Sequence, residues 1–116
     1  MNYYHFTNDI SFEISLQSVA TGSVLDPSVI SVVRLFTRKN GRVYCACYGN
    51  NTLINNGDTV TVILNNHGLE AGVLQYEVVM QIPDSIYPDK FKRVSQYYVS
   101  DIELVKGTGQ TDYADV

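Results

Sequence analysis

Two histidines and two cysteines are the residues in this chain whose types most often carry nucleophilic or metal chemistry. A Ser–His–Asp or Cys–His device needs its base within hydrogen-bond reach of a nucleophile, and a third group that orients the base. His67 lies in a turn-like stretch between Asn66 and Gly68 with no such motif around it, and His5 lies near the N-terminus. We therefore expect the His67 ring to cap backbone groups in a turn.

Cys45 and Cys47 stand two positions apart in a stretch that we expect to be a strand. That spacing gives parallel side chains and α-carbons about 6.6 Å apart. The arrangement suits two thiols much better than a disulfide. Metal sites usually use Cys-x-x-Cys with a second pair elsewhere, and the chain has no second pair. We predict that both thiols are buried as small core residues.

Four acidic residues could gather as a calcium site: Asp84, Asp89, Asp101 and Glu103. Their spacing matches no loop that supplies ligands at alternate positions, and turn formation explains Asp84 and Asp89 better. The stretch 107–109, Gly-Thr-Gly, is half of a dinucleotide fingerprint with no helix after it, so we interpret it as a linker. The sequence therefore predicts no catalytic residue, no metal ligand and no cofactor.

Tyrosine is the one overused residue, with nine copies and no tryptophan. One interpretation is that the tyrosines cover sheet edges and loops. The other is a contact face for a protein or a glycan, because tyrosine supplies a large area at a small entropic cost. We expect Tyr44 and Tyr48 to lie on the face away from the cysteines, which makes them the first candidates. The full candidate set comprises three pairs: Tyr3, Tyr4, Tyr44, Tyr48, Tyr97 and Tyr98.

Length and composition describe one domain with a real core, since the chain has 116 residues of which 45% are hydrophobic. The net charge of -4, with scattered basic residues, argues against a nucleic-acid partner. No apolar run approaches the roughly 20 residues of a membrane helix. The N-terminus lacks the basic start and apolar stretch of a signal peptide. We expect no membrane partner and synthesis in a reducing compartment.

The stretch from Asn65 to Ile82 organises the predicted fold. Alternating apolar residues from Leu74 to Ile82 predict a strand with one buried face, and Gly68 and Gly72 predict a tight connection before it. Clean alternation also predicts strands over 10–16 and 59–64.

Turn residues predict loops over 19–27 and 83–92. Further strands are expected over 28–37, 43–47 and 52–54, and the first two are joined by a hairpin at Asn40-Gly41. The last strand region, 93–106, alternates imperfectly. A bulge near Ser100 and Asp101 would let later apolar residues face inward.

Seven or so short strands separated by turn signals predict an all-β fold, an antiparallel two-sheet β-sandwich of immunoglobulin-like type. A small closed barrel is the alternative. We expect a single sandwich domain over 1–106 and a polar C-terminal tail over 107–116.

The chain resembles small immunoglobulin-like virion structural proteins of Bacteroides (crAss-like) phages and prophages. The resembling residues are Asn-His-Gly-Leu-Glu-Ala-Gly-Val-Leu-Gln-Tyr-Glu at 66–77, Ile-Pro-Asp-Ser-Ile-Tyr-Pro-Asp at 82–89, and Asp-Ile-Glu-Leu at 101–104. The opening Asn-Asp-Ile-Ser-Phe-Glu-Ile at 8–14 is also similar, and the resemblance extends to about Gly109. In that group the module resembles the N-terminal domain of head-fibre and upper-baseplate proteins, where it anchors appendages.

The resemblance implies a non-enzymatic virion protein, synthesised in the cytoplasm of the bacterial host. A head-fibre or capsid accessory subunit is favoured, because many relatives continue into a long fibre shaft and this chain stops after the module. Its expected partners are copies of itself, in a homo-oligomer, and capsid, portal-region or fibre proteins. Exposed strand edges or the tyrosine faces would provide the contacts.

Two alternatives stay open. One is a tail or baseplate component of the same virion. The other is a bacterial carbohydrate-binding or adhesion module, which predicts glycan binding that is lost when Tyr44 or Tyr48 is replaced by alanine.

Overall fold

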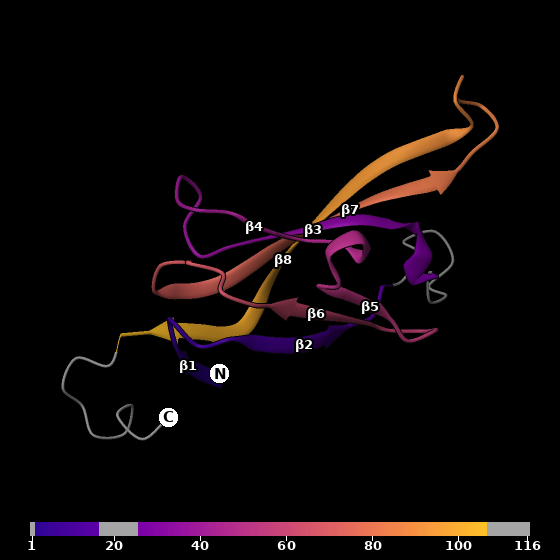
Figure 1. Cartoon of the computed structure of the whole chain (residues 1–116). Coiled ribbons are helices and arrows are strands. Elements are labelled where there is room, and N and C mark those ends of the chain that lie inside the picture. The colour runs from indigo at the N-terminus through magenta and orange to yellow at the C-terminus, as the bar shows by residue number, and fades with distance from the viewer. Residues whose placement is uncertain (1, 17–25, 107–116) are drawn as a thin grey trace.

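The computed structural model describes residues 2–16 and 26–106, which form eight strands and two single-turn 3-10 helices (Figure 1). The tail expected at 107–116, the linker at 107–109 and most of the expected loop at 19–27 lie outside these residues. In chain order the elements are β1 (Asn2–His5), β2 (Ile10–Ile14), η1 (Pro27–Val29), β3 (Ile30–Phe36), β4 (Tyr44–Ala46), η2 (Tyr48–Asn50), β5 (Leu53–Asn55), β6 (Val60–Leu64), β7 (Gly72–Pro83) and β8 (Phe91–Val105).

The strands form two sheets, one in the order β1-β8-β7-β3-β4 and one in the order β2-β6-β5. The strands β2 to β8 take the places of strands B, C, C′, D, E, F and G of a variable-type immunoglobulin sandwich. Neighbouring strands run antiparallel except β1 and β8, which are parallel. The predicted two-sheet, immunoglobulin-like sandwich is confirmed, with eight strands and one parallel pair at an edge.

The core consists of side chains at alternate strand positions, as the sequence predicts. In β7, Leu74, Val78 and Met80 are fully buried, and in β6 Val60 and Val62 meet them from the facing sheet. Alternation buries one face of each strand because successive side chains point to opposite sides. The whole core comprises Ile10, Ile14, Leu16, Ile30, Val33, Leu35, Ala46, Leu53, Val60, Val62, Leu64, Leu69, Leu74, Val78, Met80, Ile102 and Leu104.

The predicted bulge in the last strand is confirmed. Gln75 pairs with Val99 and Val73 pairs with Glu103, so residues 100–102 of β8 lie opposite Leu74 alone. The Ser100 hydroxyl donates to the Leu74 carbonyl oxygen at 2.6 Å and accepts from the backbone N–H of Ile102 at 3.1 Å. The bulge adds two residues to β8, so even-numbered residues face inward on both sides of it, from Val94 and Tyr98 to the buried Ile102 and Leu104. The inward position of Ile102 and Leu104 therefore does not depend on the bulge, contrary to the expectation from the sequence.

The connection between β3 and β4 confirms the predicted hairpin but is wider than a two-residue Asn-Gly turn. The Gly41 N–H donates to the Arg38 carbonyl oxygen at 3.0 Å, and Gly41 lacks the positive φ of a two-residue turn. Residues 37–43 are held instead by the stretch before β7. The Thr37 hydroxyl donates to the Glu70 carbonyl oxygen, and the Arg38 guanidinium pairs with the Glu70 carboxylate, each at 2.9 Å.

The predicted orientation of β4 is wrong. Ala46 is fully buried opposite Val33, whereas Cys45 is exposed and Cys47 is half-buried. Both thiols were expected in the core, with Tyr44 and Tyr48 outward. The sequence from Val43 to Tyr48 is apolar at odd and even positions alike, so alternation cannot choose the inward face. Ala46 pairs with the buried Val33 of β3, and facing residues of neighbouring strands point to the same side of the sheet, so Cys45 and Cys47 point to the other side.

β7 and β8 form a long hairpin that extends past the other strands (Figure 1). β3 pairs with β7 only from Gln75 to Met80, so residues 81–93, which we call the arm, project beyond β3. The connection at its tip is residues 84–90, shorter than the loop expected at 83–92, because both strands continue farther. The arm is therefore a two-stranded ribbon that leaves the sandwich.

The exposure of Cys45 is directly testable. We expect a maleimide to alkylate Cys45 in the native protein at a rate close to that in the denatured chain, and Cys47 to react more slowly. Peptide mapping by mass spectrometry measures both rates, and Cys45→Ser serves as the control that removes the fast phase. Protection of both thiols until denaturant is added would contradict the orientation of β4.

Candidate interaction surfaces

His67 caps two backbone groups, as the sequence predicts. Its side chain is buried, its Nδ1 accepts from the Leu69 N–H at 2.9 Å, and its Nε2 lies 3.0 Å from the Asn8 carbonyl oxygen. Because Nδ1 accepts, Nε2 carries the proton and donates to Asn8. Both ring nitrogens are thus occupied by backbone partners. The ring joins the β1–β2 connection to the stretch before β7 and has no nitrogen lone pair left to act as a base.

The predicted turn roles of two aspartates are also confirmed, at the tip of the arm. Asp84 accepts from the Ile86 N–H at 3.1 Å, and Asp89 accepts from the Phe91 N–H at 3.2 Å. A hydrogen bond from Arg93 at 2.7 Å lowers the pKa of Asp89 below its usual value, and the hydrogen bond from the Phe91 N–H lowers it further by a smaller amount. Among residues 2–16 and 26–106, no group of three His, Cys, Asp or Glu side chains is placed to hold a metal ion.

The first two tyrosine candidates have structural contacts instead of the outward position expected for them. Tyr48 packs against the core and its hydroxyl donates to the Pro27 carbonyl oxygen at 2.7 Å. Burial, with a smaller effect of the Asp26 charge, raises the pKa of Tyr48. The Tyr44 hydroxyl accepts from the Asn65 N–H at 3.2 Å, and its ring meets the His67 ring edge-on. The Tyr48 hydroxyl therefore holds the start of η1 against the sandwich, and the Tyr44 hydroxyl holds the stretch that follows β6.

The other four candidates lie on the β1 and β8 side of the five-stranded sheet. Tyr3 and Tyr4 are exposed on β1, and Tyr97 is exposed on β8, stacked on Phe36. Tyr98 is half-buried. These tyrosines belong to the strands at one edge of the sheet, whereas Tyr44 lies on β4 at the other edge and Tyr48 begins η2 just after β4. The six therefore form no single patch, and their role as a contact surface stays a prediction.

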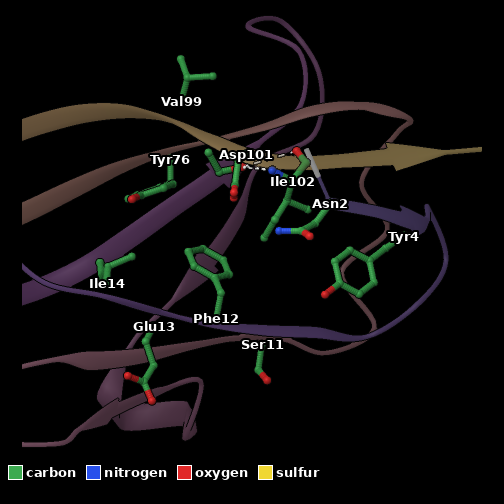
Figure 2. A pocket seen from close by; sticks show the side chains of 11 residues that line it. Asn2, Tyr4, Ser11, Phe12, Glu13, Ile14, Tyr76, Val99, Asp101 and Ile102 are labelled. Atoms are coloured by element: carbon green, nitrogen blue, oxygen red, sulfur yellow. Dashed lines mark hydrogen bonds between the residues drawn. The ribbon is translucent and has the colours of Figure 1, made fainter.

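A groove that the sequence did not reveal lies between the two sheets, where β1 and β8 face β2 (Figure 2). Its volume is about 370 Å³. Phe12 rises from β2 towards Tyr76 and Asp101, while Ser11 and Glu13 point to the opposite side of that strand. The lining residues are Asn2, Tyr4, Ser11, Phe12, Glu13, Ile14, Tyr76, Val99, Ser100, Asp101 and Ile102.

The groove presents aromatic rings beside amide, hydroxyl and carboxylate side chains. The rings of Phe12 and Tyr76 lie 5.6 Å apart between centroids, and Tyr76 stacks on Tyr98 at 5.2 Å. Burial, then the neighbouring Tyr98 and Asp101, raises the pKa of the Tyr76 phenol, which keeps it protonated. No histidine or cysteine lines the groove. Aromatic faces beside amide and carboxylate groups can hold a peptide or a sugar.

The arm and the adjoining part of β8 expose large apolar side chains. Ile86 at the arm tip is 85% exposed, and Tyr97 and Val99 on β8 are 52% and 62% exposed. The sequence identified Tyr97 as a candidate but gave no sign of Ile86 or Val99, because 83–92 was expected to be a loop and the strand over 93–106 alternates imperfectly. Tyr97 and Val99 lie two positions apart on the same face of β8, and adjacent exposed apolar side chains of this kind are typical of interaction sites.

Comparisons with protein-family models, curated proteins and solved structures found no match to this chain. Among the described residues, no helix is long and apolar enough to cross a membrane.

The structural role of His67 predicts a stability effect. We expect His67→Ala to lower the free energy of unfolding by about 1–3 kcal/mol, because the buried Leu69 N–H and Asn8 carbonyl lose their partners. Urea denaturation followed by circular dichroism measures this loss. The control is His5→Ala, which removes a ring bonded only to nearby Thr7 and should cost less than about 0.5 kcal/mol. Equal effects of the two substitutions would refute the capping role.

Proposed function

We propose that this chain is a non-enzymatic structural protein of a tailed-phage virion, a head-fibre or capsid accessory subunit that docks appendages through protein–protein contacts. The observation that carries the proposal is the resemblance of residues 66–77, 82–89 and 101–104 to small virion proteins of Bacteroides phages and prophages. These residues include the His67 turn, the arm tip and the β8 bulge. They are the parts of the chain where the fold departs from a plain alternating strand.

The fold is the one that this resemblance implies, an immunoglobulin-like sandwich. Two features further support a role in contact. Both nitrogens of the His67 ring are hydrogen-bonded to backbone groups, and five of the nine large apolar side chains that are exposed among the described residues lie on the arm or β8. The proposed partners are further copies of this chain and capsid, portal-region or fibre proteins. The proposed place of action is the virion, after synthesis in the host cytoplasm.

The decisive test is detection of the polypeptide in purified virions. We expect mass spectrometry of gradient-purified particles to find it at a fixed stoichiometry to the major capsid protein, because a structural subunit is built into every particle. Lysate proteins that merely adhere serve as the control, since their amount falls with each purification step. Absence of the chain from pure particles would overturn the assignment.

A tail or baseplate position in the same virion is the nearest alternative. Separated heads and tails distinguish the two positions, because a head-fibre or capsid accessory subunit stays with the heads. A particle reconstruction at side-chain resolution would also identify the neighbouring protein.

A glycan-binding module is the second candidate, and the groove of Figure 2 is the observation that favours it. On the virion proposal we expect no binding on a glycan array. If the groove does hold a sugar, Tyr4→Ala should weaken binding about tenfold, because an aromatic side chain supplies much of the contact area in such a site. The matched control is Tyr3→Ala on the same strand, since Tyr3 does not line the groove. Glycan binding that is lost with Tyr4 and kept without Tyr3 would favour the module over the virion subunit.

A further inference from the structure

The bulge in β8 changes the direction of one charged side chain. Even-numbered residues of β8 face inward on both sides of the bulge, so a regular strand would direct Asp101 to the outer face. Asp101 instead lines the groove between the sheets, where Figure 2 shows it directed towards Phe12. Its charge acts on the inward-facing Tyr76, whose pKa is raised by burial, by Tyr98 and then by Asp101. Bulges commonly re-aim a side chain in this way beside a functional site.

Hydrogen bonds to Ser100 hold the backbone of the bulge in place. The Ser100 hydroxyl donates to the Leu74 carbonyl oxygen at 2.6 Å and accepts from the Ile102 N–H at 3.1 Å. The side chain of Ile102 is also buried in the core. Both neighbours of Asp101 are therefore anchored before any ligand arrives. A group that is already in position adds less ordering cost to binding.

The groove combines a negative charge with further hydrogen-bond acceptors. None of the three ion pairs formed within residues 2–16 and 26–106 includes Asp101, and no lysine, arginine or histidine of these residues lines the groove. Asn2 and Tyr4 of β1 line the groove as well. Their amide oxygen and hydroxyl can accept hydrogen bonds beside the carboxylate. The polar groups of the groove thus suit a ligand that donates several hydrogen bonds and carries positive charge.

The aromatic side chains of the groove favour the same kind of ligand for a separate reason. Phe12, Tyr76 and Tyr4 line it, and the Phe12 and Tyr76 rings lie 5.6 Å apart between centroids. The face of an aromatic ring attracts a cation. A neutral sugar could also stack on these rings, but it would cover Asp101 without supplying a counter-charge, and removing an unpaired carboxylate from water is costly. The combination therefore favours a cation over a sugar.

We propose that the groove binds an arginine side chain of a partner protein, with its guanidinium beside Asp101 and against the rings of Phe12 and Tyr4. A guanidinium is planar, stacks on aromatic rings and donates two parallel hydrogen bonds to a carboxylate, whereas the ammonium of lysine is compact and strongly hydrated. Its other N–H groups can donate to Asn2. The proposal rests on the role in protein–protein contact proposed above and gives the chemistry of one such contact.

The test is binding of N-acetyl-arginine N-methylamide, which represents an arginine within a protein chain, to the whole chain. Proton–nitrogen correlation NMR spectra follow the backbone amides during the titration. We expect saturable shifts at the residues that line the groove, with a Kd on the order of 1 mM for so small a ligand. The citrulline analogue has the same shape without the charge and should bind about tenfold more weakly.

Matched variants locate the site. Asp101→Asn removes the charge at constant size and should weaken binding of the arginine analogue about tenfold. Glu103→Gln makes the same change two positions farther along β8, outside the groove, and should leave the Kd unchanged. Phe12→Leu replaces the ring by an aliphatic side chain and should weaken binding about two- to fivefold. If Phe12→Leu fails to fold, the charge variants and the citrulline comparison decide without it.

Three results would overturn the proposal: no saturable shift at the groove, equal affinities for the arginine and citrulline analogues, or equal effects of Asp101→Asn and Glu103→Gln. Saturable shifts of the groove residues with methyl glycosides, and none with the arginine analogue, would assign the groove to a glycan instead. Detection in virions is a separate measurement. A chain found in virions that does not bind the arginine analogue would keep the proposed function and lose this contact. Arginine binding by a chain absent from virions would do the reverse.

Discussion

The inward row of side chains on β7 is the constraint on which the structure depends. β7 lies between β8 and β3, and Leu74, Val78 and Met80 are fully buried beneath the facing sheet. Side chains alternate with a period of two, so a one-residue slip of β7 would bring this row to the outer face. The pairings of β3 and β8 are set against that fixed row. The cost of exposing it holds the register of the five-stranded sheet.

Two local devices let the backbone satisfy this constraint. Before β7, positive φ at Gly68 and Gly72 turns the chain, and His67 supplies partners to backbone groups buried by that turn. Opposite β7, the bulge at residues 100–102 accommodates two extra residues while Ile102 and Leu104 stay in the core, and Ser100 hydrogen-bonds to the displaced backbone. Three polar residues that could carry chemistry in the sequence, His67, Asp84 and Asp89, therefore serve as hydrogen-bond partners of backbone groups. What is left for function is the outer surface.

The sequence allowed prediction of those parts of the fold where one face is clearly more apolar than the other. The rows in β2, β6 and β7 and the bulge near Ser100 belong to this class. β4 does not belong to this class, because both of its faces are apolar. Its inward face is set by pairing with β3, where Ala46 lies opposite the buried Val33. Residues of the groove come from β1, β2, β7 and β8. Only the pairing of the strands brings them together, so no local pattern could indicate the site.

The arm lacks the support that the central part of β7 has, because only β8 pairs with β7 there. Past Met80, β7 has no β3 beside it, and the ribbon continues to a tip where Ile86 is almost fully exposed. An isolated two-stranded ribbon is marginally stable in water, since each strand satisfies only one of its two edges and little apolar area is buried. Three or more strands are needed for independent stability. The arm therefore adds little to the stability of the sandwich, whose sheet is three or more strands wide only where β3 pairs with β7.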